Sequence, residues 1–304
     1  MLKAHKEKEA MAIKTDKKNK IKMPKSARVA MWVAFSLFLI YGISLAYPLV
    51  WCFLNSLKLS QEFMEESVWA LPKYWYIENW WYCLTSMEYN DVNILGMFGN
   101  TIFFTVSCTF LSTFFSVAMA YILTKYPFPG SKGFYSFAFI LMMVPMVGNT
   151  ATSYRLAHEL KLYNTYWWPL VCSCGGFGMG FVLLYGFFKN LSWAYAEAAF
   201  IDGAGHFRVF FNIMIPMAMP AICAIAIQGA IGIWNDYYTA YMYTPDKVTI
   251  ALGLYGIQSQ NKYGKISDPE LFAAMMLTTI PVIVIYACAQ KFIIRNTTLG
   301  GVKG

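Results

Sequence analysis

The sequence predicts an all-α integral membrane protein with six membrane-spanning helices. Apolar residues make up 58% of the 304 residues and charged residues only 13%, whereas a soluble domain carries roughly 25% charged residues. The mean hydropathy is +0.45. The apolar residues gather in long runs, and a bilayer core about 30 Å thick needs roughly 20 such residues in a helix. Helices are expected because lipid cannot satisfy free backbone groups.

The first segment, residues 1–29, is expected to be a Lys-rich cytoplasmic tail. Residues 1–28 hold ten basic and three acidic residues, so they carry +7 of the chain's net charge of +8. They contain no aromatic residue for base stacking and precede a long apolar run, which favours a topology signal over nucleic-acid binding. That run is too long for a signal peptide, so it is expected to remain as the first span.

Six stretches reach spanning length, within a membrane domain expected at residues 30–294. Placing the tail in the cytoplasm puts Lys125 and Lys132 on the same side, following the Lys/Arg bias of cytoplasmic loops. An even number of spans then returns the last segment, residues 295–304, to the cytoplasm as a short tail. The stretches are Met31–Leu54, Leu95–Leu123, Phe134–Ser153, Tyr166–Phe188, Met217–Ala240 and Leu271–Ile294.

Several residues inside these stretches predict local features. Pro145 removes a backbone donor and should interrupt the third span. Gly176 and Gly180 form a Gly-x-x-x-Gly pair, which favours close helix packing. Polar side chains in the spans are candidates for a translocation path, because such groups are costly at membrane depth. The alternatives are interhelical hydrogen bonds for the asparagines and an interfacial position for the aspartate. These candidates are Asn100, Asn149, Asn235 and Asp236.

No catalytic or metal-ligating set is expected. Most of the seven cysteines lie inside apolar runs, where cysteine behaves as a small hydrophobic residue. Cys172 and Cys174 are one residue apart, which is not a metal or redox spacing. The histidines, His5, His158 and His206, are scattered. A membrane enzyme is therefore not supported by this sequence.

The loop between the fourth and fifth spans, residues 189–216, has an unusual composition. It carries apolar residues, including Phe207 and Phe211, although the loop is predicted to face water. Two explanations remain open at this point. The segment either lies on the inner membrane surface as an amphipathic helix or presents a short helix to the groove of a soluble partner.

Within this loop the order of residues resembles the EAA motif of ABC importer permeases. Glu197, Ala198 and Ala199 are followed after three residues by Gly203, then after nine by Ile213, and the stretch ends at Pro216. Ile215 stands where the motif has Leu. The Trp234-Asn235 pair, Ile280-Pro281 and the terminal Gly300-Gly301-Val302-Lys303-Gly304 resemble the carbohydrate (maltose-type) branch of this family.

The resemblance implies a type I ABC importer permease fold and a transport function. The expected role is a permease subunit that translocates a mono- or oligosaccharide across the bacterial cytoplasmic membrane. The expected partners are a second homologous permease, two cytoplasmic ABC ATPases and an extracellular sugar-binding protein. The chain itself is expected to hold no cofactor and to lack ATPase activity, because ATP and Mg²⁺ bind the partner ATPase.

Two groups of residues take roles from the resemblance. Residues 197–207 are expected to form a coupling helix that docks into the ATPase, with Gly203 allowing close backbone approach. The coupling residues are Glu197, Ala198, Ala199, Phe200, Ile201, Asp202, Gly203, Phe207, Ile213 and Pro216. An external loop is expected to reach the binding protein through Gln258, Ser259, Gln260, Asn261 and Lys262.

Some alternatives stay open. The Trp- and Tyr-rich external segment 56–94 is explained either by an interfacial aromatic belt or by stacking on sugar rings. Another importer branch, for amino acids, peptides or polyamines, would share the EAA region but not the complete Trp-Asn and terminal features. An ion-coupled secondary transporter would show inverted repeats and paired ionisable groups at the membrane centre, and the sequence shows neither.

Overall fold

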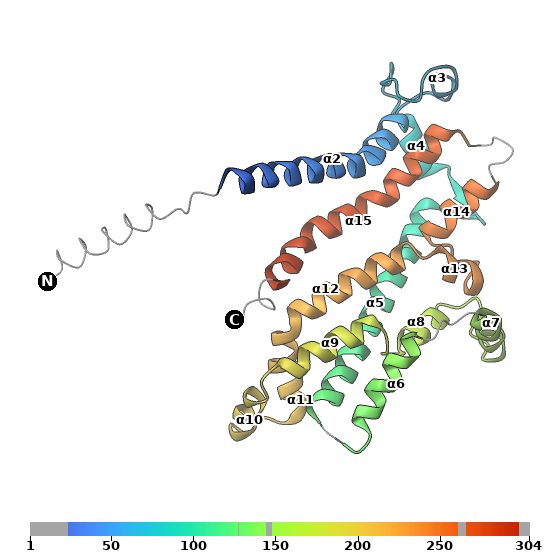
Figure 1. Cartoon of the computed structure of the whole chain (residues 1–304). Helices are drawn as coiled ribbons and strands as arrows, with labels where there is room; N and C mark the ends of the chain where they lie inside the picture. Colours follow the sequence, from blue (N-terminus) through green and yellow to red (C-terminus); the bar gives the residue numbers. More distant parts are fainter. Residues whose placement is uncertain (1–23, 127, 144–147, 261–265, 298–304) are drawn as a thin grey trace. The chain divides into compact units, whose positions relative to one another are not determined.

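The computed structural model describes residues 24–126, 128–143, 148–260 and 266–297, which are almost entirely helical (Figure 1). The chain consists of two compact units, residues 1–52 and 53–304. In the described ranges, four helices are long and apolar enough to cross a membrane: Lys25–Asn55, Ile94–Lys125, His206–Trp234 and Asp268–Ala287. The all-α fold class is confirmed, and the number of six spans stays a prediction.

Helix α2 (Lys25–Asn55) contains the first expected span. It begins directly after Pro24, inside the segment expected to be a tail, and the amide of Arg28 donates to the Pro24 carbonyl at 3.1 Å. No glycine or proline separates this first turn from the apolar run, so the helix continues without a break. At the other end of the chain, α15 (Asp268–Thr297) likewise extends past residue 294.

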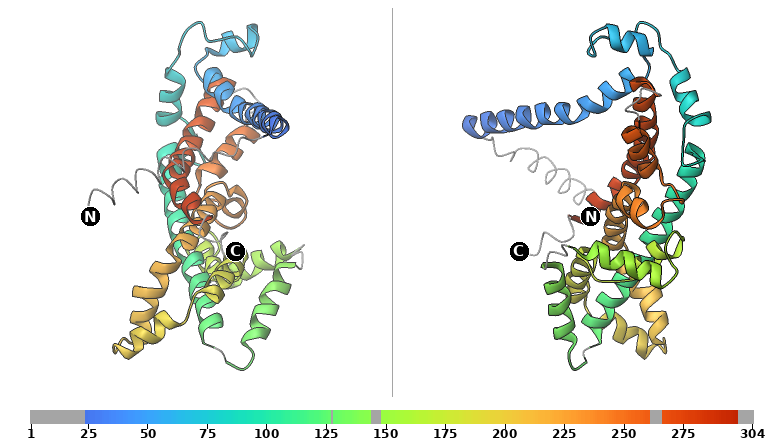
Figure 2. Two further views of the ribbon diagram at one scale, coloured as in Figure 1. Left: turned by 60° about the vertical axis from the view of Figure 1, so that its left-hand side comes forward. Right: turned by 90° about the vertical axis from the view of Figure 1, so that its right-hand side faces the viewer.

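Helix α5 (Ile94–Lys125) is the central element of the second unit (Figure 2). Its first turn is capped by the side chain of Asn93, which accepts a hydrogen bond from the Gly96 amide at 2.8 Å. Helices α9 (Met179–Asn190) and α12 (Ile215–Trp234) pack against α5, and α15 packs against α12.

Two apolar cores lie along α5. One gathers around Phe181, Leu184 and Phe188 of α9, and the other around Trp234 and Leu252. Helix α5 contributes to both, with Tyr121 near its end and Met97 near its start. The helix therefore connects the two ends of the unit.

The third and fourth apolar runs are not single helices. The division of the third run agrees with the effect expected of Pro145, whereas the expectation of one continuous helix across the fourth run is wrong. In the third run, α6 (Ser131–Met143) ends and α7 (Asn149–Glu159) begins after a gap that lies outside the described residues and includes Pro145. In the fourth, α8 (Trp167–Ser173) and α9 are separated by a turn in which Gly176 has φ +68°. Helix α8 ends at Ser173, and Gly176 gives the turn that follows a left-handed conformation, which glycine adopts without steric cost.

The close packing expected of the Gly-x-x-x-Gly pair is confirmed. A Cβ atom on Gly176 would lie 3.4 Å from the side chains of Phe115 and Met119 on α5. A Cβ atom on Gly180 would lie 2.8 Å from Cγ2 of Ile225 on α12, closer than real contacts allow. These glycines let α9 and the turn before it approach both neighbouring helices.

The segment after α2 contains two short helices, α3 (Ser60–Glu65) and α4 (Glu78–Thr85), and a small hairpin. Strands β1 (Glu88–Tyr89) and β2 (Val92–Asn93) pair antiparallel, with Glu88 opposite Asn93 and Tyr89 opposite Val92. The two residues between them, Asn90 and Asp91, both have positive φ, as a two-residue hairpin turn requires. Several aromatic side chains of this segment are exposed: Trp69, Tyr74, Trp75 and Trp81.

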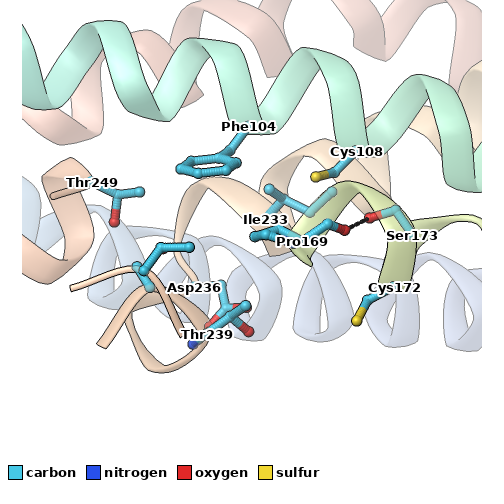
Figure 3. A pocket seen from close by; sticks show the side chains of 11 residues that line it. Phe104, Cys108, Pro169, Cys172, Ser173, Ile233, Asp236, Thr239 and Thr249 are labelled. Atoms are coloured by element: carbon cyan, nitrogen blue, oxygen red, sulfur yellow. Dashed lines mark hydrogen bonds between the residues drawn. The ribbon is translucent and has the colours of Figure 1, made fainter. Parts of the chain in front are cut away.

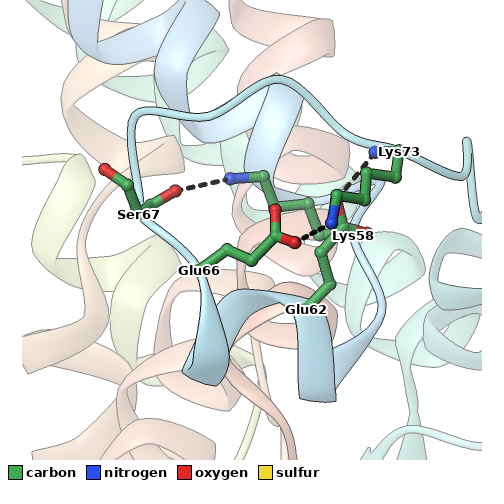
Figure 4. A network of polar contacts seen from close by, with 5 residues as sticks. All are labelled: Lys58, Glu62, Glu66, Ser67 and Lys73. Atoms are coloured by element: carbon green, nitrogen blue, oxygen red, sulfur yellow. Dashed lines mark hydrogen bonds and ion pairs between the residues drawn. The ribbon is translucent and has the colours of Figure 1, made fainter.

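A polar network with buried and exposed members holds the loop between these helices (Figure 4). The Lys58 side chain is completely buried, and its ammonium lies 3.5 Å from the Ser67 carbonyl oxygen. Glu62 accepts a hydrogen bond from the Lys73 backbone amide at 2.7 Å, while the Lys73 ammonium pairs with Glu66. The hydrogen bond to Glu66 and the negative charge of Glu66 raise the pKa of Lys73. Polar closure of the loop thus replaces an apolar core in this region.

Helix α14 (Ile250–Gln260) packs against α5 and β1 through two glycines. A Cβ atom on Gly253 would lie 2.3 Å from the sulfur of Met97, and one on Gly256 would lie 2.2 Å from the Tyr89 ring. Side chains at these positions would push the helix away from the hairpin. The glycines therefore fix the position of α14.

We expect Gly256→Ala to destabilise the protein by about 1–3 kcal/mol, because the Tyr89 ring must move to admit the methyl group. Thermal unfolding of the purified protein measures this change. Gly186→Ala is the matched control, because Gly186 lies in α9 with no atom within 4 Å of its added Cβ. Equal melting temperatures for the two variants would contradict the close packing.

Candidate coupling site and transport cavity

Helix α10 (Ala194–Ile201) carries the Glu-Ala-Ala motif and divides it between two faces. The backbone amide of Ala194 donates to the Ser192 hydroxyl at 3.3 Å, just before the first full turn of the helix. Ala196 and Ala199 are buried against the core around α9, and their small side chains let the α10 backbone approach it. Glu197 is exposed on the outer face.

The helix ends at Gly203, which has φ +82°. The Gly203 amide donates to the Phe200 carbonyl at 3.0 Å, and the Ala204 amide donates to the Ala199 carbonyl at 2.9 Å. This pair of bonds is the Schellman motif, in which a left-handed residue satisfies the last free carbonyls of a helix. No atom lies within 4 Å of an added Cβ on Gly203. Within this chain, glycine is therefore required by the backbone conformation and not by a close contact.

The expectation of one coupling helix across residues 197–207 is wrong. After the turn at Gly203, a second short helix, α11 (His206–Val209), begins and changes the direction of the chain. Helix α11 continues through a π-helical turn, η1 (Phe210–Met214), into α12. We call residues 194–209 the coupling hairpin.

Aromatic contacts attach this hairpin to the end of α5. The Tyr126 hydroxyl lies 2.8 Å from Nδ1 of His206, and the Tyr126 ring also packs edge-on against Trp193 at 5.7 Å. The Phe200 ring lies 4.9 Å from the His206 ring and 6.0 Å from Trp193. These contacts bring together residues from both arms of the hairpin and from the chain that follows α5.

The tip of the hairpin exposes apolar side chains next to carboxylates. Ile201 is 86% exposed and Phe207 is 82% exposed, whereas Phe200 is half-buried in the aromatic contacts. Glu197 and Asp202 are exposed on the same hairpin. We call Glu197, Ile201, Asp202 and Phe207 the coupling patch. Ala198, also exposed, belongs to the outer face of α10.

The last residues of the motif lie in the helix that leaves the hairpin. Pro216 is in the first turn of α12. Because it has no backbone N–H, it cannot donate to a carbonyl of the preceding turn. The π-helical turn before it shifts the hydrogen bonding, so that the Ile215 amide donates to the Phe210 carbonyl. Ile213 lies in this turn and packs against the core. The helix therefore passes Pro216 without ending, and the loop expected at 189–216 is largely helical.

At the other end of α12 a cavity of about 210 Å³ lies between α5, α8 and α13 (Tyr237–Tyr243) (Figure 3). Asp236 lines it and caps α13, because its Oδ1 accepts a hydrogen bond from the Thr239 amide at 3.0 Å. The other lining residues are mainly apolar or carry hydroxyl groups: Phe104, Cys108, Pro169, Cys172, Ser173, Ile233, Thr239, Ala240, Thr244 and Thr249.

The four polar residues expected along a translocation path do not form one site. Asn235, although next to Asp236, lines a separate cavity with Thr278 and Thr279. Asn100 lies elsewhere on α5, where it donates to the Val248 carbonyl at 3.0 Å and accepts from the Tyr166 hydroxyl at 2.9 Å. Asn149 is the exposed first residue of α7.

Comparison with known proteins identifies the family. Residues 112–298 match the family described as the binding-protein-dependent transport system inner membrane component. The chain belongs to this family.

Curated relatives of the permease support the same assignment. It is 31% identical to the probable ABC transporter permease protein YurM of Bacillus subtilis over 90% of its length and 88% of the relative's. It is 29% identical to the diacetylchitobiose uptake system permease protein NgcG of Streptomyces coelicolor, covering 88% and 87% of the two chains. The maltodextrin transport system permease protein MdxG of Bacillus subtilis is 30% identical, over 71% of the permease and 78% of that protein.

A solved structure shares the fold. A chain of a bacterial ABC transporter involved in the import of the acidic polysaccharide alginate superimposes with a TM-score of 0.76. The alignment covers 88% of the permease and 98% of that chain at 24% sequence identity. The permease is thus a multi-pass membrane protein with the type I importer fold, a transporter component that works with partner subunits.

Three of the five residues expected to form an external loop at 258–262 lie in a helix. Gln258, Ser259 and Gln260 complete the last turn of α14, where the Ser259 hydroxyl donates to the Gly256 carbonyl at 2.9 Å. Polar residues favour a loop by composition, but a serine in a helix can donate to a carbonyl of the preceding turn, as Ser259 does here. Asn261 and Lys262 lie outside the described residues.

Sequence reasoning missed most of the cavity. Phe104, Thr244 and Thr249 come from separate segments and form no motif, so only the folded chain brings them beside Asp236. A weak signal existed, because threonines recur at positions 239, 244 and 249, from the end of the fifth apolar run onward.

We expect Gly203→Val to disrupt the coupling hairpin, because a side chain in the left-handed region costs about 1–2 kcal/mol. Hydrogen exchange should become faster at the amides of Gly203 and Ala204, whose bonds form the cap. The matched control is Gly205→Val. Gly205 is also exposed and free of neighbours within 4 Å, but its φ is −78°. The same acceleration in both variants would refute the role of backbone conformation.

Proposed function

We propose that the chain is the permease subunit of a binding-protein-dependent ABC importer that carries a sugar across the bacterial cytoplasmic membrane. The names of several relatives support a sugar, because they refer to diacetylchitobiose, maltodextrin and arabinooligosaccharides. The observation that carries the coupling mechanism is the patch of exposed Ile201 and Phe207 beside two carboxylates.

In this proposal the permease pairs with a second homologous permease. Two cytoplasmic ABC ATPases bind and hydrolyse ATP, and an extracellular sugar-binding protein delivers the substrate. The permease has no ATPase activity and holds no cofactor. Both of its termini lie in the cytoplasm, on the same side as the coupling hairpin, as the Lys/Arg distribution supports.

The coupling patch docks into a groove of one ATPase. Ile201 and Phe207 lose their exposed surface there, and fully burying such side chains contributes about 1.5–3 kcal/mol each. Glu197 and Asp202 pair with basic groups at the edge of the groove. A groove with apolar walls and basic edges would bind both the apolar and the acidic side chains of the patch. A hairpin that faced only water would gain nothing from exposing the apolar ones.

The hairpin is built to transmit motion. Its aromatic contacts tie it to the end of α5, and its second arm continues directly into α12 as one helix, His206–Trp234. With 29 residues, this helix is roughly 43 Å long. A displacement of the hairpin by the ATPase is therefore carried to the far end of α12, where Asp236 lines the cavity.

We expect the double variant Ile201→Ser, Phe207→Ser to insert and pair with its partner permease but to lose ATPase binding and sugar uptake. Co-purification of the ATPase and uptake into vesicles measure the two effects. Glu197→Ala should weaken the same contact, because losing a charged partner at a buried interface costs on the order of 2–5 kcal/mol. Leu160→Ser is the control, since Leu160 is exposed near the end of α7 and distant in sequence from the hairpin. Wild-type uptake and ATPase stimulation in the patch variants would exclude the coupling role.

The orientation leads to a separate prediction. In a chain without its native cysteines, a cysteine at Thr15 should react with a membrane-impermeant maleimide only after the membrane is opened. A cysteine at Lys73 should react in intact cells, because the segment 56–94 is expected outside. Labelling of position 15 from outside intact cells would reverse the proposed topology.

A further inference from the structure

We propose that the cavity at Asp236 binds one neutral sugar ring of the transported saccharide, so that this permease contacts substrate itself. The inference rests on the proposed sugar import and names a substrate class for the cavity. It excludes saccharides whose ring at this position carries a carboxylate.

The size of the cavity suits a single ring. Its volume of about 210 Å³ is well above the roughly 10–15 Å³ that a cavity needs to hold one water molecule. It therefore admits a ligand of the size of a monosaccharide unit.

The walls match the two kinds of surface that a sugar ring presents. Phe104, Pro169 and Ile233 offer apolar faces, against which the C–H face of a pyranose can pack. Small-molecule sites typically combine such walls with a few converging polar groups. Here the hydroxyl-bearing residues Thr239, Thr244 and Thr249 supply polar groups.

Thr244 gives an independent indication that a ligand completes the cavity. Its side chain is completely buried, and its hydroxyl has no hydrogen-bond partner among the residues that the structure describes. A buried hydroxyl without a partner is unfavourable, and native structures rarely leave one. Because Thr244 lines the cavity, rotation of its side chain would bring this hydroxyl to a sugar hydroxyl bound there.

Asp236 determines the charge that the cavity accepts. It is the charged residue in the lining, and its Oδ1 already caps α13. Its Oδ2 receives no hydrogen bond in the described part of the chain, so it can accept one from a sugar hydroxyl. A carboxylate on the substrate would meet a like charge, which raises the cost of binding. A metal cation is a poor occupant, because hard cations take about six or more oxygen ligands and these walls are largely carbon.

Cys172 provides a reporter at the cavity. Its side chain is exposed and lines the cavity together with Asp236 (Figure 3). It also lines a second cavity at Gln228, so the variants below assign the protection to the cavity at Asp236. In the assembled transporter, with every other cysteine of this chain replaced, the rate of Cys172 modification by a small maleimide measures occupancy. We expect millimolar glucose, galactose or N-acetylglucosamine to slow this reaction. Glucuronate and galacturonate, which differ by the carboxylate, should leave the rate unchanged.

Two variants test the polar groups. Asp236→Asn keeps the helix cap, since Asn is an equally good cap, but removes the charge. Neutral sugars should then protect Cys172 from the maleimide about ten-fold more weakly, as expected for the loss of a charge-assisted hydrogen bond. Glucuronate should now protect Cys172 as well. Thr244→Val should weaken protection about five-fold, as for one neutral hydrogen bond, without loss of stability. Thr279→Val, in the neighbouring cavity, should leave protection unchanged.

The outcomes separate this inference from the proposed function. Saccharide uptake into vesicles by the same transporter tests import by itself. If import proceeds while no neutral sugar slows Cys172 modification, the cavity does not bind substrate and the importer assignment stands. Equal protection by glucose and glucuronate, or unchanged protection in Asp236→Asn, also overturns the inference. If vesicles import no saccharide at all, the proposed function fails first.

Discussion

The continuity of the helix His206–Trp234 is the constraint on which the remaining features depend. Pro216 and Pro220 both lie in this helix, and a proline in a helix interior normally kinks or breaks it. The π-helical turn at Phe210–Met214 accommodates the first proline by shifting the hydrogen bonds before it. Because the helix survives, the coupling hairpin and the cavity at Asp236 are the two ends of one element. A break at Pro216 would separate them.

The fold class follows from hydropathy because a bilayer leaves the backbone few alternatives to a helix. The positions at which helices end are less predictable, since apolar composition is the same on both sides of a break. The turn at Gly176 lies inside a run that reads as one span, and it depends on a single left-handed residue. The glycine-rich sequence indicated close packing there, which the contact with Phe115 confirms. It did not indicate that the same glycine would lie in a turn between two helices.

The coupling and cavity residues differ in how far a sequence can predict them. Glu197 and Gly203 lie in one short motif, so their proximity is local, although the motif does not reveal that Gly203 ends α10 through its φ. Asn235 and Asp236 are adjacent in sequence, yet the end of α12 turns between them and directs them to different cavities. Adjacency at a helix end therefore says little about a shared site. Thr244 and Asp236 flank opposite ends of α13, and only the packing of this helix brings them into the lining of one cavity.

Exposure alone does not mark a functional surface in this protein, because lipid can cover apolar side chains along the spans. Val106 and Phe110 on α5, for example, are both exposed apolar residues in the described part of the chain. The coupling patch differs because Ile201 and Phe207 share a short hairpin with two exposed carboxylates. Carboxylates are costly in hydrocarbon, so the bilayer cannot cover this hairpin. Water accepts the charges but not the apolar side chains. A protein groove with apolar walls and basic edges satisfies both groups, and this combination favours a soluble partner over lipid.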